Sequence, residues 1–151
     1  RGNREAAIQA RLSDVQAAGL EAVILGPSNP FLSIDPILAL PGMAQRLRAF
    51  GAPVVAVSPI VGGRAIKGPT AKIMQELGMA VDVVSVASHY RGLIDGLVID
   101  HADRDARGAI EAMGIEVMVQ ATVMVTLQDR VRLAQACMDF AAHCRGRAGS
   151  E

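Results

Sequence analysis

Side chains that could bind a small ligand gather in two loops of this sequence. The first loop supplies hydroxyl, amide and carboxylate groups among prolines, namely Ser28, Asn29, Pro30, Ser33 and Asp35. The second supplies a serine, two adjacent glycines and three cations, namely Ser58, Gly62, Gly63, Arg64, Lys67 and Lys72. Adjacent glycines let backbone amides approach an anion, and nearby cations neutralise its charge. The second loop therefore predicts a phosphate-binding site.

Each loop follows a short apolar run that reads as a buried strand. The first run is 22–25, which stops at Gly26-Pro27, and the second is 52–57. Ligands of open parallel sheets bind outside the carboxyl ends of the strands, so both loops stand where a site is expected. The alternative is that the loops are polar connections without a ligand.

A helix follows the second loop, and single residues in it can again be interpreted either as part of a ligand site or as ordinary structural positions. Gly68-Pro69 opens a helix over 70–77, with Ile73, Met74 and Leu77 expected to face inward. Its free N–H groups could bind a phosphate. Lys72 lies in its first turn, where a cation opposes the helix dipole unless an anion is bound. The alternative is a solvated lysine on an ordinary helix face. Asp35 is either a carboxylate that stabilises a helix N-terminus or a catalytic acid.

Both loops resemble one known family. The stretches GPSNPFLSIDPILALPG (26–42) and AVSPIVGGRAIKGPTAK (56–72) are similar to the second half of the 2-phospho-L-lactate transferases, which build the deazaflavin coenzyme of the F-420 type. The likeness runs from about Ala22 to about Met124. The alternative is a non-catalytic, nucleotide-sugar-binding regulator of the gluconeogenesis-factor type, which shares the fold. The Ser28-Asn29-Pro30 turn argues against that alternative.

The resemblance implies a reaction and its partners. A phospholactyl or phosphoenolpyruvyl group would pass from a guanylyl-activated donor to the terminal hydroxyl of the deazaflavin Fo, with release of GMP. Magnesium would be the cofactor, and a homodimer is one of the oligomeric states that the resemblance allows. Ser28 and Asn29 would hydrogen-bond substrate, with Ser33 and Asp35 in support, and Pro30 would offer apolar surface to the flat ring. Ser58, Gly62 and Gly63 would line the opposite wall, while Arg64, Lys67 and Lys72 would supply positive charge. No general base can be named.

The resemblance also implies that residues 1–151 are the C-terminal portion of a single α/β transferase domain. The chain starts at Arg1 without an initiator methionine, so the metal ligands and nucleotide loop are expected in an N-terminal half. A third alternative is an inert fragment whose sheet edge needs that half to cover it. One departure from the family stands at Gln120-Ala121-Thr122, where a Thr-Asp-Thr-like turn is expected.

Composition excludes several kinds of partner. Fifteen basic and fifteen acidic residues cancel, so no overall charge indicates binding to nucleic acid or an anionic membrane. No apolar run reaches the roughly 20 residues that span a bilayer, and a cytoplasmic location is expected. Cys137 and Cys144 lie seven apart in a helical pattern, about 10 Å between Cα atoms, and are expected to be free thiols.

Helices and strands alternate along the chain. Helices are expected at 3–18, 43–50, 70–77, 102–113 and 127–142, with a short one from Ser33. Strands are expected at 22–25, 54–57, 97–99 and 115–119, and 81–90 is ambiguous between strand and the short helix that the resemblance implies. Residues 145–151 are expected to fray. The pattern predicts an α/β fold, a three-layer, mostly parallel Rossmann-like sheet that is a partial domain here.

Overall fold

Four parallel strands form the centre of the computed structural model, which describes residues 6–7, 10–11, 13–15 and 18–148. In spatial order they are β1 (Val23–Leu25), β2 (Val54–Val57), β5 (Gly96–Ile99) and β6 (Glu116–Val119). The two inner strands, β2 and β5, are buried along their whole length. Continuous apolar runs of this kind are typical of parallel sheets that are covered on both faces. The predicted α/β class and parallel sheet are confirmed.

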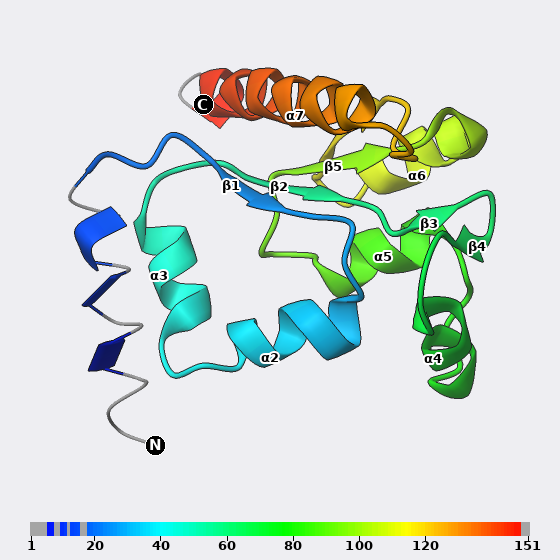
Figure 1. The fold of residues 1–151 in the computed structure, drawn as a ribbon, viewed down its shortest axis with the longest axis horizontal. Coiled ribbons are helices and arrows are strands. Elements are labelled where there is room, and N and C mark those ends of the chain that lie inside the picture. Colours follow the sequence, from blue (N-terminus) through cyan, green and yellow to red (C-terminus); the bar gives the residue numbers. More distant parts are fainter. Residues whose placement is uncertain (1–5, 8–9, 12, 16–17, 149–151) are drawn as a thin grey trace.

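Helices cover both faces of the sheet (Figure 1). On one face, α7 (Leu127–Ala148) packs Leu133, Cys137 and Phe140 against the alternate residues Val55 and Val57 of β2. The other face carries α2 (Asp35–Leu38), α3 (Met43–Ala49), α5 (Val83–His89) and α6 (Arg107–Glu111). There the core includes Val54, Ala56, Val86 and Ile110. The sheet therefore separates two apolar cores.

The second predicted loop contains a hairpin that the sequence pattern did not predict. Its strands, β3 (Ile60–Val61) and β4 (Arg64–Ala65), are antiparallel and joined by Gly62 and Gly63. Both glycines have positive φ, 56° and 75°. A two-residue hairpin turn of the primed type requires this conformation, which glycine adopts without a steric penalty.

The helical segment after β1 begins earlier than predicted. Its first turns are η1 (Pro30–Ile34), and the side chain of Asn29, not that of Ser33, caps them. Asn29 fits this place because its amide oxygen can reach free N–H groups one turn ahead. Helix α4 (Thr70–Glu76) forms where expected, but Leu77 is 59% exposed and not inward.

The ambiguous stretch 81–90 is helical, as the resemblance implied, and forms α5. The segment 102–113 divides into a 3-10 helix, η2 (His101–Ala106), and α6. Helix α7 continues through Ala148, further than predicted, since Cys144 is still buried against the sheet. The predicted helix at 3–18 lies partly outside the described residues, and the described positions 6–7, 10–11 and 13–15 are helical.

Both cysteines are free thiols, as predicted, and both are buried in the core under α7. Burial raises the pKa of the Cys137 thiol to about 11. Across the described part of the chain, every helix is too short or too polar to span a bilayer.

Candidate functional site

Three loops at the carboxyl ends of the strands meet around a small cavity of about 120 Å³. The loop after β1 contributes Pro27, the loop after β2 and its hairpin contribute Ser58, Pro59, Ile66 and Lys67, and the loop after β6 contributes Thr122 and Met124. The cavity thus lies where ligands bind in open α/β sheets. Its wall combines apolar side chains, two hydroxyl groups and one lysine, a set suited to a ligand with an apolar body and a charged group.

Ser58 shapes the cavity wall through its own turn. Its hydroxyl accepts a hydrogen bond from the Ile60 amide at 3.1 Å and donates one to the Ile60 carbonyl at 3.0 Å. The side chain is 1% exposed. A buried hydroxyl needs such partners. Ser58 therefore fixes the exit from β2.

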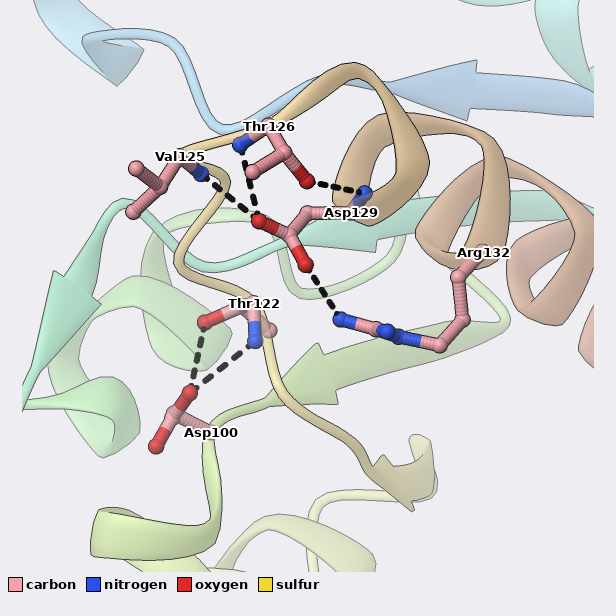
Figure 2. Close-up of polar contacts among 6 residues, drawn as sticks. All are labelled: Asp100, Thr122, Val125, Thr126, Asp129 and Arg132. Atoms are coloured by element: carbon pink, nitrogen blue, oxygen red, sulfur yellow. Dashed lines mark hydrogen bonds and ion pairs between the residues drawn. The ribbon is translucent and has the colours of Figure 1, made fainter.

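Asp100, which follows β5, anchors the third loop (Figure 2). One carboxylate oxygen accepts hydrogen bonds from the Thr122 amide at 2.9 Å and the Thr122 hydroxyl at 3.3 Å. The other accepts from the Ala102 amide at 3.1 Å. The sequence placed Asp100 and the loop after Val119 at strand ends but did not pair them. Thr122 follows Ala121, which stands where the family pattern led us to expect an acid. The carboxylate that holds this loop comes from Asp100.

A reciprocal capping box fixes the start of α7 beside this loop (Figure 2). The Thr126 hydroxyl accepts a hydrogen bond from the Asp129 amide at 3.1 Å, and the Asp129 carboxylate accepts from the Thr126 amide at 2.8 Å. The Val125 amide donates to the same carboxylate oxygen at 3.1 Å. These hydrogen bonds, first those from the backbone amides, hold the pKa of Asp129 well below its ordinary value.

Asp103, which lies in the same segment as Asp100, anchors the hairpin. The Gly62 amide donates to both carboxylate oxygens of Asp103, at 3.1 and 3.0 Å. The amide that the sequence offered to a phosphate therefore binds an internal carboxylate in this structure. Gly63 and Arg64 lie on the same hairpin, away from the cavity wall, and Arg64 is exposed. The segment 100–103 thus holds two of the three loops through Asp100 and Asp103.

The predicted binding residues of the first loop do not line the cavity, although the preceding Pro27 does. Asn29 accepts hydrogen bonds from the amides of Phe31 and Leu32 at 3.0 and 3.1 Å, and Pro30 is buried. Ser28 and Ser33 are exposed. The Nδ2 group of Asn29 is buried and has no hydrogen-bond partner among the described residues.

Asp35 joins the first loop to α5. Its carboxylate lies 2.9 Å from Nε2 of His89, and the His89 ring contacts the Phe31 ring edge-on with centroids 5.0 Å apart. Tyr90 is buried next to this pair, and its pKa is raised, first by burial and then by the charge of Asp35. The pair fastens η1 and α2 onto α5.

The three cations separate in space. Lys67 lines the cavity, while Lys72 lies on α4 with its ammonium 3.8 Å from the Glu76 carboxylate. That ion pair matches the solvated-lysine alternative, because exposed pairs one turn apart are ordinary features of helix surfaces. Of the eleven predicted binding residues, Ser58 and Lys67 line the cavity.

The described residues do not offer a metal site of their own. None of them form a group of three or more histidine, cysteine, aspartate or glutamate side chains that could hold a metal ion. Asp100, Asp103 and Asp35 are each engaged with a protein donor. Magnesium prefers several oxygen ligands, so these side chains do not fit the cofactor that the resemblance implies.

Comparison with known proteins agrees with the resemblance. The family model for the 2-phospho-L-lactate transferase CofD matches residues 2–137. A 2-phospho-L-lactate transferase of Methanocaldococcus jannaschii is 42% identical over 120 residues, which are 80% of this chain and 37% of that protein. A phosphoenolpyruvate transferase of Kitasatospora aureofaciens is 35% identical over 129 residues, 85% of this chain and 40% of that protein.

The chain therefore spans about two fifths of the length of the curated relatives it matches. The matched segment contains all three loops around the cavity, from Pro27 to Met124. With the family model covering most of its length, the chain belongs to the 2-phospho-L-lactate transferase CofD family.

Proposed function

We propose that this chain forms one wall of the active site of an enzyme that transfers a phospholactyl or phosphoenolpyruvyl group to the deazaflavin Fo. The relatives are named as transferases of 2-phospho-L-lactate or of phosphoenolpyruvate. The observation that carries the proposal is the cavity at the carboxyl ends of the strands, where three loops of the matched segment converge on Lys67.

In the proposed reaction the terminal hydroxyl of Fo attacks the phosphorus atom that carries the lactyl or enolpyruvyl group. A phosphorus–oxygen bond forms, the bond to the bridging oxygen breaks, and GMP leaves with that oxygen. The hydroxyl proton passes to solvent or to a base outside this chain. Such a transfer depends on alignment and on charge neutralisation more than on covalent help from the protein.

The residues of this chain have separate tasks in the proposal. Lys67 supplies a positive charge at the cavity wall, as a flexible point charge suited to a phosphate oxygen. Pro27, Ile66 and Met124 offer apolar surface for the flat deazaflavin ring. Asp100 and Asp103 act as positioning residues, because they hold the third loop and the hairpin in place. When bound, magnesium would neutralise phosphate charge, and its ligands are expected elsewhere in the enzyme.

Titration of Fo into the purified chain, followed by deazaflavin fluorescence, tests the proposal. We expect saturable binding of Fo and of its phospholactyl product, which carries the phosphate that Lys67 would bind. The product, not Fo, should bind roughly tenfold more weakly to Lys67→Ala, since a charge-assisted contact is lost. Lys72→Ala is the matched control, because it also removes one lysine but one that pairs with Glu76 away from the cavity. Equal affinities of Lys67→Ala and the parent chain for the product would contradict the assignment of the cavity. Absence of binding by a folded chain, and by a version extended to the relatives' length, would contradict the proposed acceptor.

A further inference from the structure

A second cavity, of about 500 Å³, lies at the opposite edge of the sheet. Its walls include the residues that lead into β2, β5 and β6, at positions 51–54, 91–95 and 113–115. The end of α3 and the C-terminal part of α7 complete it, and Figure 1 shows both helices reaching the side where the strands begin. The volume falls within the range of about 300–1,000 Å³ that is typical of small-molecule sites.

Positive charge is concentrated around this cavity. Arg48, Arg91 and Arg145 line it together with a single acid, Asp95. The Asp95 carboxylate accepts a hydrogen bond from the Val54 amide at 2.7 Å, which holds it at the start of β2. The chain as a whole has no net charge. The cavity is therefore a local cationic region on a neutral protein, which attracts anions.

None of the three guanidinium groups forms an ion pair with an acid of the described residues. Arg145 donates through Nη2 to the backbone carbonyls of Leu20 and Glu21, which are uncharged acceptors. The side chains of Arg48 and Arg91 make no hydrogen bond or ion pair with any residue that the structure describes. Arg48 lies in the last turn of α3, where it also compensates the helix dipole, and Arg91 directly follows the C-cap of α5.

The floor of the cavity is apolar. Leu47, Ala52, Ile94 and Ile115 are all buried, and they line the same cavity as the arginines. A surface of low polarity behind a charge strengthens its interaction with an ion of opposite sign. Arginine forks also match two neighbouring anionic oxygens. We propose that this cavity binds a small polyanion with clustered negative charges, of which a diphosphate is the simplest, and that Arg48 and Arg91 hold it.

This inference goes beyond the proposed function and does not depend on it. Calorimetric titration of inorganic pyrophosphate into the 151-residue chain at constant ionic strength tests it. We expect one saturable site, weakened at least about tenfold in the double variant Arg48→Ala/Arg91→Ala, because two charge-assisted contacts disappear.

The matched control is Arg46→Ala/Arg104→Ala, which removes the same charge from positions that do not line the cavity. Amide chemical shifts give a second readout, with the largest changes expected at Gly92 and Gly114. The proposal is overturned if a cooperatively melting chain shows no saturable binding. It is also overturned if both double variants weaken binding equally, or if the shift changes centre on the Gly62 hairpin.

Discussion

The Asp100 carboxylate accepts two hydrogen bonds from Thr122, one from its backbone amide at 2.9 Å and one from its hydroxyl at 3.3 Å. Asp100 follows β5 and Thr122 lies in the loop after β6, so one carboxylate ties two neighbouring strand ends together (Figure 2). Partial burial would raise the pKa of Asp100, but these bonds and one from the Ala102 amide outweigh it, and the pKa lies below its ordinary value.

Asp100→Asn should make the chain less stable at neutral pH. A carboxyl group with a lowered pKa in the folded state stabilises the fold above its unfolded pKa, about 3.9, and this contribution is lost as the pH falls through the folded pKa. We expect the free energy of unfolding to drop by about 1–2 kcal/mol at pH 7, as for a lost hydrogen bond to a charged group. Urea unfolding at pH 7 and pH 3 measures it.

The difference between Asp100→Asn and the parent chain should shrink toward zero at pH 3. Asp105→Asn is the control, since the Asp105 side chain is exposed and makes no hydrogen bond with the described residues. A difference that stays the same at both pH values would mean that the charge of Asp100 is not what holds Thr122.

Asn29→Ala should destabilise the segment after β1. The Asn29 side chain satisfies two free amides at the start of η1, and loss of such a cap costs about 1 kcal/mol. Asn29→Asp should keep most of the stability, because a carboxylate accepts the same hydrogen bonds. Ser28→Ala, at the exposed neighbouring position, should have little effect. Thermal unfolding of the three variants gives the comparison. If Asn29→Asp is as harmful as Asn29→Ala, the buried Nδ2 group is the part that matters.

Gly96→Ala should weaken the packing of α7 on the sheet. A Cβ atom at Gly96 would lie 2.6 Å from the Phe140 ring and 3.1 Å from the Cys144 sulfur. Overpacking of this kind costs about 1–3 kcal/mol in a core. Gly108→Ala is the matched control, since nothing lies within 4 Å of its Cβ position and alanine favours the helix. Denaturant unfolding should rank Gly96→Ala below the parent and Gly108→Ala at or above it, and Phe140→Leu should partly rescue Gly96→Ala.

The Asp35–His89 pair should show measurable coupling. The two side chains are 2.9 Å apart and join α2 to the end of α5, although both are partly exposed. A double-mutant cycle with Asp35→Ala and His89→Ala should give an interaction energy of about 0.5–1 kcal/mol in unfolding experiments. Additive effects of the two substitutions would mean that the contact between Phe31 and His89, not the one between Asp35 and His89, fastens the first loop.

The layered fold could be read from the sequence because its signals are local. Apolar runs at 54–57 and 97–99 are continuous, as buried parallel strands require. Gly51 and Gly114 follow the helices that precede β2 and β6. The β3–β4 hairpin was not predicted because each of its strands is two residues long. Such strands are too short to show an alternation of apolar and polar residues. Leu77 was placed inward from helical spacing, but it lies just past the end of α4.

The candidate site was only partly predictable from the residues. The sequence by itself determined which loops follow strands, and hence that Ser58 and Lys67 stand near one edge of the sheet. It could not determine that Asp103 binds the Gly62 amide, or that Asp100 binds Thr122, since these partners are 41 and 22 residues apart. Only the tertiary structure decided these pairings, because a carboxylate binds whichever amide the packing of strands and helices brings within about 3 Å.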